Sequence, residues 1–80
     1  MKDNSIQRWT GQNIARDLAK SQGVKWSDVI GKRRFPRLMV IRRAIADTLR
    51  RNTNLSLLEI GYIMERDHTT VMNLLRPKVR

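Results

Sequence analysis

A cluster of short polar side chains opens the last apolar segment of the chain, RDHTTVMNLL, at residues 66–75. Asp67 is followed by His68, the only histidine, and then by Thr69 and Thr70. An imidazole can donate or accept a hydrogen bond, a threonine offers a hydroxyl and a methyl group, and a carboxylate accepts from an amino group. These groups match what base edges present in the major groove of DNA. At the first turn of a helix, the cluster could therefore read a base sequence.

A simpler interpretation of the same residues is a helix N-terminus that binds nothing. Asp67 is well placed to cap the helix, and an aspartate followed by threonines can serve only as such a cap. That interpretation explains Asp67 and Thr70 but leaves His68 without a role. A lone histidine is usually an ordinary surface or core residue. From the spacing alone, both interpretations stay open.

The charge balance of the chain predicts a polyanionic partner. Among its 80 residues, 17 Lys and Arg stand against 7 Asp and Glu, which gives a formal net charge of +10. Such an excess favours nucleic acid first and an anionic membrane surface second, and a charge that serves only solubility is the alternative. The length predicts a single domain over residues 1–80, and 40% hydrophobic residues suffice for one compact core.

The composition also excludes several classes of chemistry. The chain has no cysteine and one histidine, so we expect no disulfide, no metal site and no cofactor. It holds no paired-carboxylate motif and no Ser-His-Asp spacing, so we expect neither an enzyme nor a small-molecule substrate. No apolar run approaches the roughly 20 residues that span a membrane, and the start, MKDNSIQRWTG, lacks a signal-peptide core. We expect a cytoplasmic, nucleoid-associated protein.

The apolar spacing predicts helices and no strands, and hence an all-α fold. The segment TGQNIARDLAKSQG, residues 10–23, carries apolar residues on one face and a glycine that ends the helix, Gly23. The residues before it, 1–9, are a candidate flexible segment. WSDVIG, residues 26–31, predicts a short turn of helix with Ser27 as its N-cap.

The basic residues in the middle of the chain fall in a loop and on one helix face. Gly31 is expected to end the short helix, and KRRFPR, residues 32–37, then predicts a basic loop in which Pro36 disfavours helix for Phe35. An amphipathic helix follows, because apolar residues recur three or four positions apart at Leu38, Ile41, Ile45 and Leu49. Its other face is expected to be basic and to carry Arg42, Arg43, Arg50 and Arg51.

The last two helical segments have the spacing of a helix-turn-helix over about residues 56–76. Ser56 and Glu59 form the S-x-x-E capping box that opens SLLEIGYIME. Gly61 lies where two steeply crossing helices need a small residue, and a short polar turn, residues 65–67, joins them. In such a unit the second helix enters the major groove with its N-terminus first. The positions expected to be buried between the helices are Ile60, Met64, Val71 and Leu74.

Three strings in the chain resemble the DNA-binding C-terminal domain, domain IV, of the bacterial chromosomal replication initiator DnaA. The family's signature runs S-L-x-E-I-G and then G-G-R-D-H-T-T-V, and this chain has SLLEIG at residues 56–61 and RDHTTV at residues 66–71. KRR, residues 32–34, matches the family's basic loop, at a fitting distance from EIG. The resemblance covers about residues 14–76. It implies a small helical bundle that contains a helix-turn-helix, of the Trp-repressor-like or DnaA C-terminal type.

The resemblance implies a role for each matching residue. In the family, the last arginine of the basic loop enters the minor groove, and the R-D-H-T-T segment reads the major groove of the site called the DnaA box. The base contacts implied here are Arg34, Asp67, His68 and Thr69. The expected phosphate contacts are Lys32, Arg33, Arg37, Arg43, Arg50, Ser56, Leu57, Arg66, Thr70, Asn73 and Arg76. The implied function is sequence-specific binding of double-stranded DNA in replication initiation or its regulation, with other replication proteins as further partners.

The chain also departs from the family pattern. After KRR it has FPRLMVIRR, so the entry to the long helix differs and Arg43 replaces a glutamine. Leu58 stands where proline is common, and Glu65 stands in place of the two glycines of the turn. No G-x-x-x-x-G-K-[ST] phosphate loop occurs, so the initiator's ATPase domain is missing from this sequence. We expect either a free-standing domain, which the first methionine and the divergent loop favour, or a piece of a longer protein.

Two rival functions remain for the same residues. The helices could form an interaction module that docks on a replication or transcription protein, with the charge only assisting. Residues 38–51 alone could also form a basic amphipathic helix on an anionic membrane. The membrane interpretation does not explain RDHTTV, and we therefore expect no membrane partner.

Overall fold

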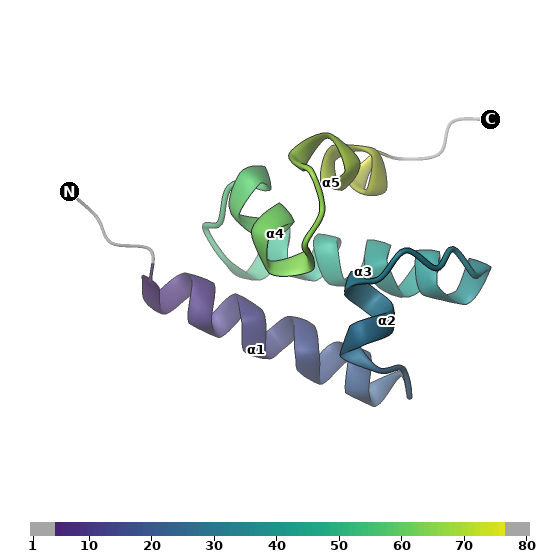
Figure 1. Cartoon of the computed structure of the whole chain (residues 1–80). Helices are drawn as coiled ribbons and strands as arrows, with labels where there is room; N and C mark the ends of the chain where they lie inside the picture. The colour runs from purple at the N-terminus through teal and green to yellow at the C-terminus, as the bar shows by residue number, and fades with distance from the viewer. Residues whose placement is uncertain (1–4, 77–80) are drawn as a thin grey trace.

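The chain folds into five helices around one apolar core. The computed structural model describes residues 5–76, with side chains from residue 8 onward, and contains no strand in that range. The helices are α1 (Ser5–Ser21), α2 (Trp26–Ile30), α3 (Pro36–Asn52), α4 (Leu57–Met64) and α5 (His68–Leu75). Helix α3 packs against all the others, with α1 on one side of it and α4 and α5 on the other (Figure 1). The predicted all-α class is confirmed.

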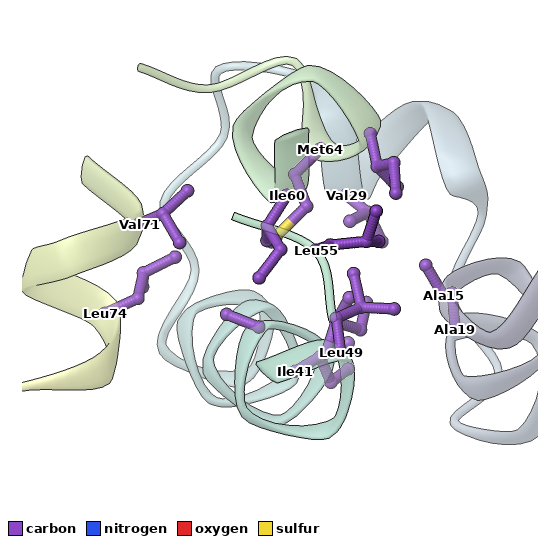
Figure 2. Packing of buried hydrophobic residues seen from close by; sticks show 13 residues of the cluster. Ala15, Ala19, Val29, Ile41, Leu49, Leu55, Ile60, Met64, Val71 and Leu74 are labelled. Carbon is purple, nitrogen blue, oxygen red and sulfur yellow. The ribbon is translucent and has the colours of Figure 1, made fainter. Parts of the chain in front are cut away.

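The apolar stripe of α3 forms the centre of the core. All four predicted positions on this stripe are buried, and three of them, Ile41, Ile45 and Leu49, belong to a cluster to which every other helix contributes (Figure 2). Leu55, from the segment between α3 and α4, completes the cluster. Ile45, Leu49, Ile60 and Met64 are fully buried, and each such side chain stabilises the fold by roughly 1.5–3 kcal/mol.

Helix α1 begins earlier and ends where the sequence predicts. It starts at Ser5 and not near Thr10, so residues 5–9 of the candidate flexible segment are helical, while residues 1–4 lie outside the described range. Gly23 follows the helix with a φ of +74°. Its amide donates to the carbonyl of Lys20 at 3.0 Å, and the amide of Val24 donates to that of Ala19 at 3.1 Å. These bonds form a Schellman motif, which needs a left-handed residue at the position of Gly23.

The N-cap predicted for α2 is wrong. Lys25 is the N-cap, and Ser27 lies inside the helix. The Lys25 carbonyl accepts from the amides of Asp28 at 3.0 Å and Val29 at 3.2 Å, so the first turn closes two residues before Ser27 could cap it. Gly31 ends the helix as predicted.

Helix α4 begins at its predicted signal, but α3 begins two residues earlier than predicted, so Pro36 and Arg37 of the predicted basic loop are helical. Phe35 is the N-cap of α3 and Pro36 its first residue, a position at which the missing proline N–H breaks no helical bond. Before α4 the capping box is complete. The Glu59 amide donates to the Ser56 hydroxyl at 3.2 Å, and the Ser56 amide donates to the Glu59 carboxylate at 3.1 Å.

Arg42 does not belong to the basic face of α3. The sequence places it there, but it is only 3% exposed. It follows Leu38 by four residues and precedes Ile45 by three, so it lies on the same side of the helix as the buried stripe. Its guanidinium finds hydrogen-bond acceptors at the end of α2.

Candidate nucleic-acid interface

A tight left-handed turn joins α4 to α5 and fixes the angle between them. Glu65 has φ +53° and ψ +46°, and it is the one non-glycine residue with positive φ in the described chain. The Arg66 amide donates to the carbonyl of Gly61 at 2.8 Å, and the Glu65 amide donates to that of Tyr62 at 3.3 Å. Helix α4 therefore ends in a Schellman motif like that of α1, but with glutamate at the left-handed position.

Gly61 allows the turn to fold back over α4. A Cβ atom at this position would lie 2.5 Å from the carbonyl oxygen of Arg66 and 3.5 Å from the backbone nitrogen of His68. The first of these distances is too short for any side chain. The sequence correctly predicted the need for a small residue, although the close neighbour is the backbone of the turn and not a crossing helix.

Helix α5 is anchored by its apolar side and exposes its polar start. Val71 and Leu74 are buried and project from α5 toward the part of the core that holds Ile60 and Met64 (Figure 2). This confirms the burial predicted for the helix-turn-helix. The polar cluster at the start of the helix is exposed at every position, Asp67, His68, Thr69 and Thr70.

Asp67 occupies the N-cap position but does not cap the helix through its side chain. The helix starts at His68, as the spacing predicts, yet the Asp67 carboxylate makes no hydrogen bond to the backbone of α5. One carboxylate oxygen lies instead 3.2 Å from Nδ1 of His68. The carboxylate therefore contacts the imidazole that follows it, and the capping interpretation of this residue is wrong.

The basic loop lies beside α5. Lys32, Arg33 and Arg34 are exposed. A surface pocket joins the loop to the helix, and its lining residues are Lys32, Arg34, Met39, Arg42, Arg66, Thr70 and Leu74. Arg33 faces elsewhere, because its guanidinium lies over the ring of Phe35, 5.7 Å from the ring centre. The fold thus brings Arg34 and Thr70, which are far apart in sequence, to one surface.

Other predicted phosphate contacts gather around α5 as well. One depression is lined by Arg50, Leu57, Met72, Leu75 and Arg76, from α3, α4 and the end of α5. A second is lined by Met39, Val40, Arg43, Asn73 and Leu74. Arg43 also donates to the carbonyl of Arg76 at 3.3 Å. These residues surround the helix on the sides of α3 and α4.

Besides Arg43, three more predicted phosphate contacts have partners within the chain. Arg37 donates to the carbonyl of Gln22, so its guanidinium lies at the turn between α1 and α2. Ser56 is exposed but serves the capping box. Arg66 is half-buried, and its guanidinium donates to carbonyls at the end of α2, those of Val29, Ile30 and Gly31.

The cluster of Arg42 and Arg66 at the end of α2 was not anticipated from the sequence. Burial lowers the pKa of Arg42 from its usual value, and the positive charges of Arg66 and Arg34 lower this pKa further. The signal for Arg42 was its position within the apolar stripe of α3. The partners of Arg66 leave no local signal, because they lie 35 to 37 residues away.

Two further features of the described chain bear on its possible functions. Among residues 5–76, no group of three or more His, Cys, Asp and Glu side chains could hold a metal ion. In the same range no helix is long and apolar enough to cross a membrane.

Known proteins are similar in sequence to the part of the chain that builds this surface. A family model described as the bacterial dnaA protein helix-turn-helix matches residues 12–76, a range that contains every candidate contact. The chromosomal replication initiator protein DnaA of Herpetosiphon aurantiacus is 34% identical over 67 residues, which make up 82% of this chain and 14% of that protein. The chain thus spans a small part of this curated relative. No solved structure gives a significant match.

Proposed function

The chain belongs to the family of the bacterial DnaA helix-turn-helix, and from this premise we propose that it binds double-stranded DNA in a sequence-specific manner. Helix α5 is the recognition helix and enters the major groove, and the basic loop, residues 32–35, enters the adjacent minor groove. The target is a DnaA-box-like site, and the role is in replication initiation or its regulation. The name of the curated relative, a chromosomal replication initiator, supports this role.

The observation that carries the proposal is the orientation of α5. Its buried side, Val71 and Leu74, holds the helix against α4, while the four polar residues at its start are all exposed. A helix held in this way can insert its N-terminus into the major groove without unfolding. Asp67, His68 and Thr69 then face base edges, and Thr70 faces a phosphate.

The remaining cations surround the recognition helix and suit the phosphate backbone. In the proposal, Arg43, Arg50 and Arg76 contact phosphates beside the major groove, together with Asn73 and Leu57, while Lys32 and Arg33 contact them beside the minor groove. Lys32 and Arg34 line the same pocket as Thr70, which supports simultaneous binding in neighbouring grooves. Phosphate contacts fix the register of the protein on the duplex, and base contacts select the sequence.

The resemblance to the DnaA family assigns Arg34 to the minor groove, and the charge and hydration of arginine support this assignment. A narrow, A·T-rich minor groove has an enhanced negative potential that attracts arginine. The guanidinium is more weakly hydrated than the ammonium of lysine, so its entry into the groove loses less hydration energy. Arg34 is exposed, and its neighbour Arg33 is turned toward Phe35.

Charge-conserving variants test this assignment. We expect Arg34→Lys to weaken binding most on duplexes with an A·T run beside the major-groove site, and less when that run is replaced by G·C. Arg33→Lys is the matched control and should bind both duplexes as the parent does. Fluorescence anisotropy titrations at one fixed salt concentration measure both. If Arg34→Lys binds both duplexes like the parent, Arg34 is not in the minor groove.

One observation favours a second candidate, a module that docks on a replication or transcription protein. Leu58 and Tyr62 lie one helical turn apart on α4 and are 49% and 65% exposed. A titration of the chain with a DnaA-box duplex and a scrambled duplex separates the two functions. Equal affinity for both duplexes would remove sequence-specific DNA binding and leave the docking module.

A further inference from the structure

At the C-terminal end of α2, backbone carbonyls accept hydrogen bonds from two arginines that are far away in the sequence, Arg42 and Arg66. The last carbonyls of a helix receive no hydrogen bond from N–H groups of the same helix, so their donors must come from elsewhere. Helix α2 is only five residues long, so its final carbonyls and that of Gly31 point out of its C-terminal end. The donors come from Arg42 on α3 and from Arg66 in the turn before α5.

Arg42 donates three of these bonds. Its Nε donates to the carbonyl of Val29 at 2.8 Å, and its Nη2 donates to those of Asp28 at 2.8 Å and Gly31 at 3.0 Å. Only the fixed fork of a guanidinium presents several N–H groups in one plane, so a lysine could not make this set.

Arg66, in the turn before α5, also binds the C-terminal end of α2. Its Nη1 donates to the carbonyl of Ile30 at 3.2 Å, and its Nη2 donates to that of Val29 at 3.2 Å and to that of Gly31. Two guanidinium groups therefore share the carbonyls of Val29 and Gly31. The two guanidinium groups repel each other, while the Asp28 carboxylate attracts Arg42 more weakly.

The arginine cluster lies directly next to both proposed DNA-facing segments in the sequence. Gly31 directly precedes the basic loop, and Arg66 directly precedes the polar start of the recognition helix. The shared carbonyls therefore join the base of one DNA-facing segment to the base of the other. Six hydrogen bonds from charged donors meet at this joint, and such bonds are stronger than those between neutral groups.

We propose that Arg42 and Arg66 act as positioning residues, an arginine clamp that fixes the basic loop relative to the recognition helix so that both grooves are engaged together. The proposal rests on the proposed function and deepens it, because it names what sets the geometry of two-groove binding. Arg42 is 3% exposed and cannot itself reach a phosphate. Any effect of Arg42 on DNA binding must therefore act through the residues that it positions.

The first test needs no DNA. NMR relaxation measures the order parameters of the backbone amides at residues 32–34 in the free protein. We expect Arg42→Lys to lower them from the rigid range near about 0.85 toward about 0.6, while those of α3 and α5 stay unchanged. Arg51→Lys is the matched control, because Arg51 is exposed and pairs with Asp47 on its own helix. A loop that stays as rigid in Arg42→Lys as in the control would overturn the clamp.

The second test is a double-mutant cycle on a duplex with an A·T run. We expect Arg34→Ala to weaken binding by about tenfold in the parent but by less than about threefold in Arg42→Lys, because an unclamped loop no longer holds Arg34 in the groove. An equal loss in both backgrounds would contradict the proposal. If Arg42→Lys does not fold, as thermal melts would show, the half-buried Arg66→Lys takes its place in both tests. If the parent protein binds all duplexes equally, the proposed function is wrong. The clamp would then be tested by the order parameters of residues 32–34 alone.

Discussion

At the residue scale, Glu65 holds a conformation that suits glycine. Its φ of +53° lies in the left-handed region, which costs an L-residue roughly 1–2 kcal/mol, while glycine reaches it freely but loses about 0.5–1 kcal/mol through the flexibility of the unfolded chain. We expect Glu65→Gly to raise the free energy of unfolding by about 0.5–1 kcal/mol, measured by urea denaturation.

Glu65→Ala is the control for this prediction. It removes the same carboxylate but keeps a Cβ atom in the left-handed region, so the backbone strain stays and no gain is expected. Equal stabilisation by alanine and glycine would assign the gain to the lost charge and not to the turn.

His68 and Thr69 are the residues at which base reading can be separated from general affinity. Both are exposed at the start of α5. We expect His68→Ala and Thr69→Ala each to lose about 1–3 kcal/mol on the preferred duplex and little on random DNA, because in the proposed complex their side chains contact base edges. Anisotropy titrations with the two duplexes measure this difference. Equal losses on both would mean that the side chains serve only the backbone contacts or the fold.

At the scale of the element, α4 depends on its cap. The Ser56 hydroxyl accepts from the Glu59 amide at 3.2 Å, and this bond satisfies an N–H that has no partner inside the helix. We expect Ser56→Ala to lower the free energy of unfolding by about 1 kcal/mol, as measured by thermal and urea denaturation.

Ser27→Ala provides the matched control for the cap. Ser27 is an exposed serine inside α2, where the Lys25 carbonyl already accepts the first bonds of the helix. Since no cap is lost, its stability should change by less than about 0.5 kcal/mol. Should both variants melt together with the parent, the start assigned to α4 would be wrong.

At the scale of the whole molecule, the excess of positive charge should control affinity through counterion release. If the loop and the cations around α5 neutralise about six phosphates, log K against log salt should fall with a slope of about −5. Arg50→Gln should reduce the magnitude of that slope by about one, since it removes one of the proposed phosphate contacts.

Arg16→Gln is the control for the charge prediction. Arg16 lies on α1, where its guanidinium is 5.5 Å from the ring centre of Trp26. The Arg16→Gln substitution removes the same unit of charge as Arg50→Gln. Its slope should match the parent's. A parent slope near zero, or equal changes in both variants, would show that net charge and not a specific phosphate surface attracts the DNA.

The features that the sequence determined by itself are local ones. The apolar stripe of α3, the glycine after α1 and the capping box of α4 each depend on residues within about one or two helical turns of each other. Such short spacings fix both the secondary structure and the face that is buried. The same holds for the start of α5, whose exposed polar cluster and buried Val71 and Leu74 were predicted from their order.

The two wrong predictions of helix caps, at Ser27 and Asp67, also came from local preferences. In both places a second partner was available for the same hydrogen bond. Ser27 could cap a helix, but the backbone of Lys25 closes that turn first. Asp67 stands at the right position, but its carboxylate contacts His68 and not the backbone. The residue type limits which hydrogen bonds a side chain can make, and the neighbouring atoms in the fold determine which of them forms.

Only the tertiary structure decided how the two proposed DNA-facing segments are joined. Arg42 looked like one more cation on a basic helix face, and no local spacing indicated that Arg66 donates to the end of α2. The bonds of Arg66 span 35 to 37 residues, a separation at which no periodicity or spacing in the sequence indicates contact. The placement of the basic loop beside α5 follows from that packing, because the carbonyls left unpaired by a short helix had to be met by donors from elsewhere in the fold.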